Sequence, residues 1–131
     1  MASGFDISAS INKMIELRFQ TPQDKSEALA RIHLLLDISI SLAEKRGAQG
    51  TELAARNDVI KQELAEARSV LADVQQRREA GTAAAYEVQE AQADVDDLVQ
   101  ELAANRQLIA SIRTFHSDVI KQADDIIKSA A

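Results

Sequence analysis

The chain of 131 residues contains no cysteine and no tryptophan, and aromatic residues make up only 3% of it. Without cysteine, disulfide bonds and thiolate metal sites are excluded. Four glycines and one proline leave few tight turns, so a β-sandwich or barrel is not expected. The hydrophobic residues, 46% of the chain, are mainly alanine, leucine, isoleucine and valine. We therefore predict an all-α protein built from a few long helices.

The charge and the apolar runs limit the kind of partner. The formal net charge of −6 disfavours nucleic acid or an anionic membrane as the main partner. The longest apolar stretch, residues 32–40, includes His33, Asp37 and Ser39 and is too short to span a membrane. The first residues lack the basic and apolar regions of a signal peptide. We expect a cytoplasmic protein without membrane insertion, or a periplasmic one if the sequence is an excised fragment of an exported protein.

Two helices are predicted within residues 1–50. The first covers about residues 7–19, because apolar residues recur there every fourth position, and Asp6 or Ser8 is its N-cap. The second begins at Thr21 and Pro22, since threonine can cap a helix and proline is tolerated at the first helical position. It extends to about Arg46.

The second predicted helix is apolar on almost every side. A helix of this kind must be surrounded by protein, and a chain of this length has few helices to surround it with. We therefore expect self-association through this helix, with a homodimer as the simplest form. The residues assigned to this contact are Leu35, Ile38 and Leu42.

Two glycines interrupt the pattern after this helix. Gly47 and Gly50 would each cost about 1 kcal/mol inside a helix, so a loop is the simpler interpretation. The apolar register nevertheless continues through the glycines to Leu53. A kinked continuous helix is therefore the alternative.

The rest of the chain has two heptad patterns, which predict a coiled-coil hairpin. The first pattern occupies residues 51–79, at positions 53, 57, 60, 64, 67, 71, 74 and 78. The second occupies residues 83–128, at positions 84, 88, 91, 95, 98, 102, 105, 109, 112, 116, 119, 123 and 126. The phase changes at Gly81 and Thr82, where glycine suits the left-handed C′ position and threonine can cap the next helix. We predict a single all-helical domain, residues 1–131, with a hairpin over residues 51–131 and its tip near residues 81–82.

Three polar residues fall on the heptad patterns. Asn57 and Asn105 are candidates for fixing register or oligomeric state, a role known for buried asparagine in coiled coils. His116 has no second histidine three or four residues away, so a helical metal site is not expected. No nucleophile motif or phosphate-binding glycine loop is present, and we predict no catalysis, cofactor or metal.

Acidic residues accumulate after the tip. Glu87, Asp94 and Glu101 recur every seven residues and line one edge of the second heptad pattern. The favoured interpretation is a solvated face, partly paired across the hairpin by Arg77 with Glu87. The alternative is a docking strip for a basic partner. A simple hairpin register also brings Glu63 near Glu101, an unfavourable pair.

The sequence of residues 77–95, RREAGTAAAYEVQEAQADV, resembles the periplasmic hairpin tip of TolC-like outer-membrane factors. That family has a basic or aromatic residue, then glycine with threonine or leucine, then an acid-Val-x-x-Ala-Gln stretch. The resemblance implies that Arg78, Gly81 and Thr82 form a docking tip for the adaptor protein of an efflux or type I secretion system. Gln89 departs from the family pattern, and the absence of strand segments and of a second repeat excludes a complete outer-membrane factor.

Together these features predict a non-enzymatic coiled-coil interaction module. It would bind protein partners as an adaptor, export chaperone or assembly factor, and it would self-associate. The alternative is a structural hairpin of a secretion or efflux assembly, as the tip resemblance implies.

Overall fold

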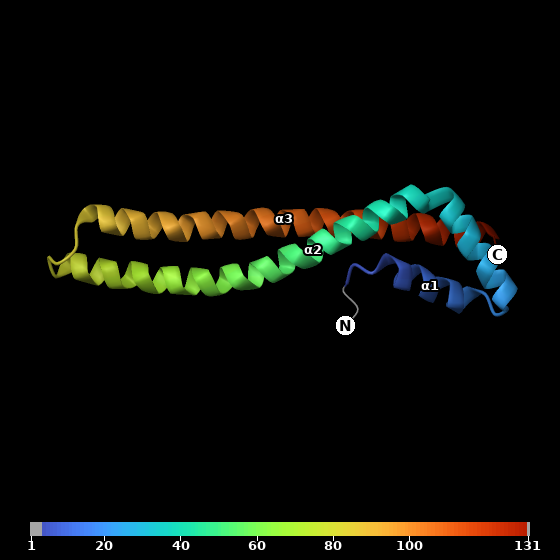
Figure 1. Ribbon diagram of the computed structural model, residues 1–131, viewed down its shortest axis with the longest axis horizontal. Coiled ribbons are helices and arrows are strands. Elements are labelled where there is room, and N and C mark those ends of the chain that lie inside the picture. Colours follow the sequence, from blue (N-terminus) through green and yellow to red (C-terminus); the bar gives the residue numbers. More distant parts are fainter. Residues whose placement is uncertain (1–3, 131) are drawn as a thin grey trace. The chain divides into compact units, whose positions relative to one another are not determined.

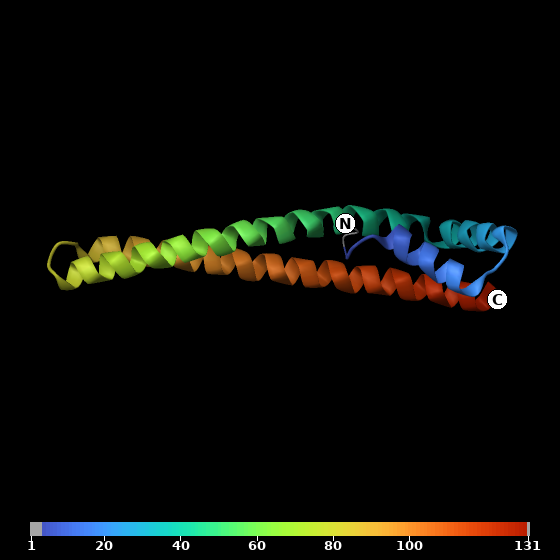
Figure 2. The same cartoon turned by 90° about the horizontal axis from the view of Figure 1, so that it is seen from below.

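The computed structural model describes residues 4–130, and these residues form three α-helices (Figure 1). Helix α1 comprises Ile7–Arg18, α2 comprises Pro22–Glu79 and α3 comprises Ala85–Ala130. Helices α2 and α3 run antiparallel and form a hairpin, as the two views in Figures 1 and 2 show. The predicted all-α fold with a helical hairpin is confirmed. Among the described residues, no helix is both long and apolar enough to pass through a lipid bilayer.

The chain divides into two compact units. The first unit consists of the described residues of Met1–Glu52 and Ile109–Ala131, and the second unit is Leu53–Leu108. Helices α2 and α3 each contribute a segment to both units.

The starts of α1 and α2 follow the predicted capping. The Asp6 carboxylate accepts a hydrogen bond from the Ala9 N–H at 3.0 Å, so Asp6, and not Ser8, is the N-cap of α1. The Thr21 hydroxyl oxygen accepts one from the Asp24 N–H at 3.2 Å. Because each oxygen satisfies an N–H that has no partner inside its helix, both boundaries are fixed locally by the sequence.

Helix α2 is continuous across Gly47 and Gly50, so the predicted loop is wrong and the alternative of a continuous helix is confirmed. One helix, not two, therefore precedes the hairpin. Both glycines are buried and make room for Phe5. A Cβ atom at position 47 would lie 2.9 Å from the Phe5 Cβ, and one at position 50 would lie 3.1 Å from two carbons of the Phe5 ring. Helix α2 therefore carries glycine here to admit an aromatic side chain, and the low helix propensity of glycine does not interrupt it.

The first unit is a three-helix arrangement around an aliphatic core. The three isoleucines of α1 are spaced four residues apart and lie on one buried face. The core consists of Ile7, Ile11, Ile15, Ala28, Ile32, Ile40, Ala43, Val119, Ala123 and Ile127. At its edge the Arg46 guanidinium lies 4.4 Å from the Phe115 ring centroid, within the range of a cation–π interaction.

The second unit is a two-helix hairpin whose core follows the predicted heptads. The buried positions are Asn57, Ile60, Leu64, Val74, Ala91, Val95, Leu102 and Asn105, and all of them belong to the predicted patterns. Arg78 and Ala84, also predicted on the patterns, are exposed because they flank the tip. The heptad prediction is thus confirmed between the tip and the far end of this unit.

The tip is closed by a Schellman motif at the end of α2. Gly81 has φ +80°, its N–H donates to the Arg78 carbonyl at 3.0 Å, and the Thr82 N–H donates to the Arg77 carbonyl at 2.8 Å. The Thr82 hydroxyl also donates to that carbonyl, so it caps α2, and the prediction that it caps the next helix is wrong. At the start of α3, Glu87 accepts from the Ala84 N–H at 2.7 Å, as in one half of a capping box.

Candidate protein-interaction surface

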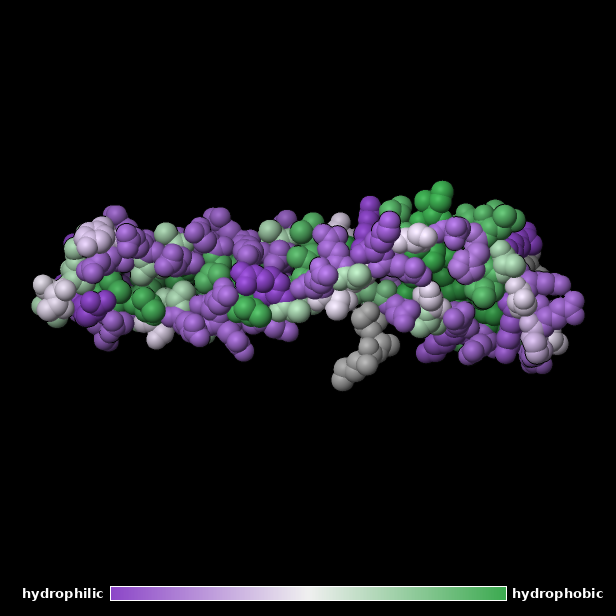
Figure 3. Space-filling view, viewed as in Figure 1, coloured by the Kyte–Doolittle hydropathy of each residue, from purple (hydrophilic) through white to green (hydrophobic). Residues whose placement is uncertain are grey.

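Helix α2 exposes four large aliphatic side chains within the first unit. The exposed fractions are 82% for Leu34, 58% for Leu35, 78% for Ile38 and 41% for Leu42. We call these four residues the α2 apolar face. They occupy relative helix positions 0, 1, 4 and 8, which share one side of a helix. Figure 3 shows hydrophobic atoms projecting at the upper right, above the N-terminal part of α2 in Figure 1.

The opposite side of the same segment forms the core of the first unit. Ile32, Ile40 and Ala43 are at most 3% exposed, whereas the α2 apolar face is uncovered. Large apolar residues of this segment therefore lie on two sides of α2, and α1 and α3 cover only one of them. Single exposed hydrophobic residues are common on proteins, but a contiguous group marks a candidate interface.

Basic residues stand at both ends of the α2 apolar face. Arg31 and Lys45 are exposed, and within the described part of the chain neither forms a salt bridge. Beside the face, His33 Nδ1 lies 3.8 Å from the Asp37 carboxylate. The face is thus an apolar strip with free charge only at its margins.

The structure gathers all three residues predicted for self-association, Leu35, Ile38 and Leu42, on this face. Sequence reasoning did not assign Leu34 to the site, although Leu34 is the most exposed of the four. A helical projection that opposes it to the buried Ile32 and Ala43 would have identified it. The missing information was which side of α2 the other two helices occupy.

The predicted docking tip is a second exposed region. Arg78, Gly81 and Thr82 are all exposed, and a Cβ atom at Gly81 would meet nothing within 4 Å. A shallow hollow beside the tip is lined by Gln75, Arg78, Glu79 and Val88. The tip therefore presents a fixed backbone turn with few large side chains.

The predicted acidic edge has mostly internal roles. Glu87 caps α3, and Glu101 accepts two hydrogen bonds from Arg56 at 3.1 and 3.2 Å, while Asp94 is exposed. The predicted pairing of Arg77 with Glu87 is wrong, because Arg77 Nε contacts its own-helix neighbour Asp73 at 3.1 Å. Two of the three acids thus have partners within the chain, and their role as a docking strip for a basic partner stays a prediction.

Arg56 removes the like-charge conflict expected between Glu63 and Glu101. Its guanidinium lies 3.4 Å from Glu63 and 3.1 Å from Glu101, so one cation bridges both carboxylates. The hydrogen bond to Glu101 raises the pKa of the Arg56 guanidinium above its usual value. The pairing is exposed and mainly orients the two helices of the second unit.

The polar residues on the heptad patterns, Asn57, Asn105 and His116, are buried or half-buried inside the helix packing. Asn105 Nδ2 donates to Asn57 Oδ1 at 3.1 Å in the buried interior of the second unit. His116 is half-buried, and its Nδ1 has no hydrogen-bond partner among the described residues. Within residues 4–130, no three histidine or acidic side chains gather as a metal-binding group.

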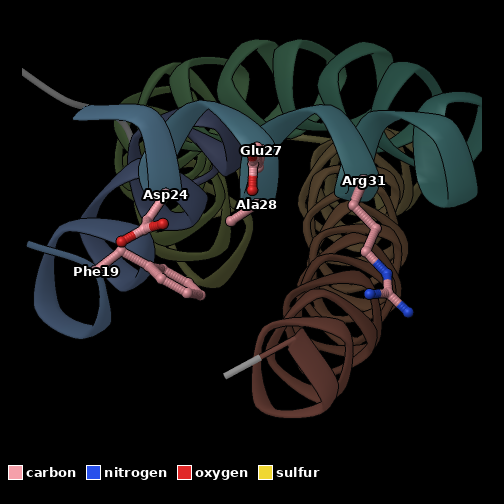
Figure 4. Close-up of a pocket in the computed structure, with 5 residues that line it drawn as sticks. All are labelled: Phe19, Asp24, Glu27, Ala28 and Arg31. Atoms are coloured by element: carbon pink, nitrogen blue, oxygen red, sulfur yellow. The ribbon is translucent and has the colours of Figure 1, made fainter. Parts of the chain in front are cut away.

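A hollow near the start of α2 is lined by Phe19, Asp24, Glu27, Ala28 and Arg31 (Figure 4). Figure 4 shows the Phe19 ring below Asp24, while Arg31 extends away from both. The charged groups do not converge on one point, so this hollow offers no evident ligand chemistry.

Compared with known proteins, the chain matches no family model, no curated protein and no solved structure. The likeness of residues 77–95 to a TolC-like tip stays a prediction that rests on those residues alone.

Proposed function

We propose that this protein is a non-enzymatic interaction module, of the adaptor, export chaperone or assembly factor kind, which self-associates through the α2 apolar face. The observation that supports it is the exposure of Leu34 and Ile38, at 82% and 78%, beside Leu35 and Leu42. A helix face of this pattern binds an apolar helix or groove.

The energetics favour a partner that is itself apolar. Full burial of one leucine or isoleucine side chain contributes roughly 1.5–3 kcal/mol, and these four are already partly covered. Association costs about 4–15 kcal/mol in lost freedom. Burial of these four side chains alone therefore offsets little more than the lowest estimate of the association cost. A partner that buries aliphatic side chains of its own provides the remaining stabilisation.

The first unit presents this face in a preformed conformation. Ile32, Ile40 and Ala43 are anchored in the core directly behind it, so α2 need not fold when the partner binds. A rigid face avoids the entropy cost of ordering a segment on binding.

The test is a pair of polar substitutions on the face, Leu35→Gln with Ile38→Asn, in the full chain. We expect the wild-type protein to be oligomeric by light scattering on a sizing column and the double variant to be monomeric. Leu108→Gln is the matched control, because Leu108 is 47% exposed but lies in the second unit. Circular dichroism checks that all variants stay helical. A wild-type monomer, or an oligomer that both substitutions leave intact, would remove the proposal.

A second candidate function rests on the exposed tip with its left-handed Gly81. In this alternative the hairpin docks on the adaptor protein of a secretion or efflux assembly through Arg78, Gly81 and Thr82. Gly81→Asp would abolish binding to the hairpin domain of such an adaptor and leave helicity intact. Gly81→Asn is the control for backbone strain, since asparagine tolerates this conformation. Equal binding by wild type and Gly81→Asp would exclude this function.

A further inference from the structure

The exposed side of α2 has a palindromic pattern about Ile38. Leu34 and Leu42 stand four residues before and after Ile38, and the basic residues Arg31 and Lys45 stand seven residues before and after it. All five residues are exposed. A twofold symmetric contact pairs residue i with residue j and j with i, so an antiparallel contact centred on Ile38 sets residues equally distant from Ile38 against each other.

We propose that the occupant of the α2 apolar face is a second copy of this chain, packed antiparallel on it across a twofold axis at Ile38. The inference rests on the proposed function, which already assumes self-association, and adds the orientation and register of the two copies. In this arrangement Ile38 meets Ile38 of the second copy, and Leu34 meets Leu42 of the second copy. Leu35, the fourth residue of the face, then lies against Ser41 of the second copy, while the Leu34–Leu42 contact occurs twice, once on each side of the axis.

The main alternative to this arrangement is an antiparallel dimer with a shifted register. Moving the axis two residues toward the N-terminus would pair Glu27 with Lys45 of the second copy. It would also set Leu42 against Ala30, a much smaller side chain, and so bury less apolar surface. An exposed ion pair changes an equilibrium constant by about fivefold at most, whereas burial of a large aliphatic side chain changes it by more than tenfold. The register centred on Ile38 is therefore preferred.

A parallel pair is disfavoured by charge. It would set Glu27 against Glu27 and leave Arg31 and Lys45 against their own copies. The antiparallel pair centred on Ile38 sets Glu27 against the neutral Gln49. It still brings Arg31 near Lys45 at each end of the contact. Salt screens that repulsion, so the affinity between copies should rise with ionic strength, whereas a register held by Glu27 and Lys45 would weaken.

The bend of α2 is compatible with this contact. Figure 1 shows that α2 bends in its N-terminal part, and Figure 3 shows hydrophobic atoms projecting on the outer side of that bend. A contact centred on the projecting side chains leaves the ends of the strip further from the second copy, which reduces the repulsion between the basic residues.

The absence of cysteine from the chain makes disulfide mapping a direct test. Single variants Leu34→Cys, Ile38→Cys and Leu42→Cys of the full chain are prepared, with one preparation tagged so that mixed dimers are distinguished by mass. Under mild oxidation we expect Ile38→Cys to cross-link with itself, and a mixture of Leu34→Cys and Leu42→Cys to cross-link about tenfold faster than either variant alone, because a disulfide requires close Cα atoms. Leu108→Cys is the control and should remain at background.

The outcomes separate this inference from the proposed function. Fast cross-linking of Leu34→Cys with itself, or of a mixture of Glu27→Cys and Lys45→Cys, would overturn the orientation or register while the dimer on the α2 apolar face stands. An affinity that falls with added salt would overturn the register in the same way. A wild-type chain that is monomeric by light scattering, or a dimer in which no α2 variant cross-links, would overturn both.

Discussion

The two units of the molecule use the same helix α2 in different ways. In the second unit the residues of α2 outside the heptad pattern are mainly polar, and the buried side meets α3 through aliphatic side chains and the Asn57–Asn105 hydrogen bond. In the first unit α2 is apolar on two sides, and α1 and α3 cover only one of them. The second unit thus buries the apolar side of its α2 segment within the chain, whereas the first unit leaves Leu34, Leu35, Ile38 and Leu42 exposed.

The largest expected effect on stability comes from truncating a side chain on the covered side of α2, in contrast to the same change on the uncovered side. Ile32→Ala should destabilise the first unit by about 2–5 kcal/mol, because Ile32 is fully buried and truncation leaves a cavity. Ile38→Ala is the same chemical change on the uncovered side, and it should alter the stability of the monomer by less than about 0.5 kcal/mol. Chemical denaturation at a concentration where the chain is monomeric compares the two, and equal effects would contradict the assignment of the sides.

Substitutions of Asn57 and Asn105 should separate the effect of this pair on helix register from its effect on the stability of the second unit. Asn105→Ala leaves the Asn57 amide buried without its partner and should cost about 1–3 kcal/mol. Replacing both residues by leucine should recover or exceed the wild-type stability, while helix register becomes less well defined. Denaturation measures the first effect, and line broadening in amide NMR spectra the second. A double variant as unstable as Asn105→Ala would show that the pair itself stabilises the hairpin.

The glycines of α2 provide a sharper comparison within the first unit. Alanine at position 50 gains about 1 kcal/mol of helix propensity but meets the Phe5 ring. Gly50→Ala should therefore stabilise the chain more in a Phe5→Ala background than in the wild type. Gly47→Ala should stay unfavourable in both backgrounds, because its Cβ meets the Cβ and carbonyl oxygen of Phe5. A thermodynamic cycle measures both, and identical effects at position 50 would contradict the role given to Phe5.

The smallest expected effect is on the stability of the first unit at acidic pH. The hydrogen bond from Lys128, with the charge of Arg18, holds the pKa of the Asp124 carboxyl below its usual range. A lowered pKa contributes stability above the unfolded value, and that stability is lost as the pH falls through the folded value. Asp124→Asn should thus flatten the loss of stability below about pH 4. An unchanged profile would show that the ion pairs at 2.9 and 3.1 Å contribute nothing measurable.

Features set by neighbouring residues in the sequence could be predicted. The caps at Asp6 and Thr21, the heptad positions and the tip at Gly81 each depend on residues within about one helical turn or on a regular repeat. The continuity of α2 was left open by the sequence, because the glycines favoured a loop and the apolar register through them favoured a continuous helix. The contact of Phe5 with Gly47 and Gly50 was not visible in the sequence, because both glycines follow Phe5 by more than forty positions.

The candidate site could be predicted only in part. The apolar pattern around α2 predicts an apolar surface on more than one side, and Leu35, Ile38 and Leu42, which were assigned to self-association from it, are exposed on one face. The pattern does not state which side α1 and α3 occupy, so Leu34 was missed. Likewise, the conflict between Glu63 and Glu101 was visible in the sequence, but its resolution by Arg56 depends on a side chain from the same edge of α2 reaching both carboxylates.

Thiol accessibility measures whether another copy of the chain covers the α2 apolar face. The rate at which a maleimide alkylates Ile38→Cys is measured across a range of protein concentrations, with Leu108→Cys as the reference. If copies cover this face, alkylation at position 38 slows as the protein concentration rises, while the rate at position 108 stays constant. Equal rates at position 38 at all concentrations, with the chain fully helical, would contradict this coverage.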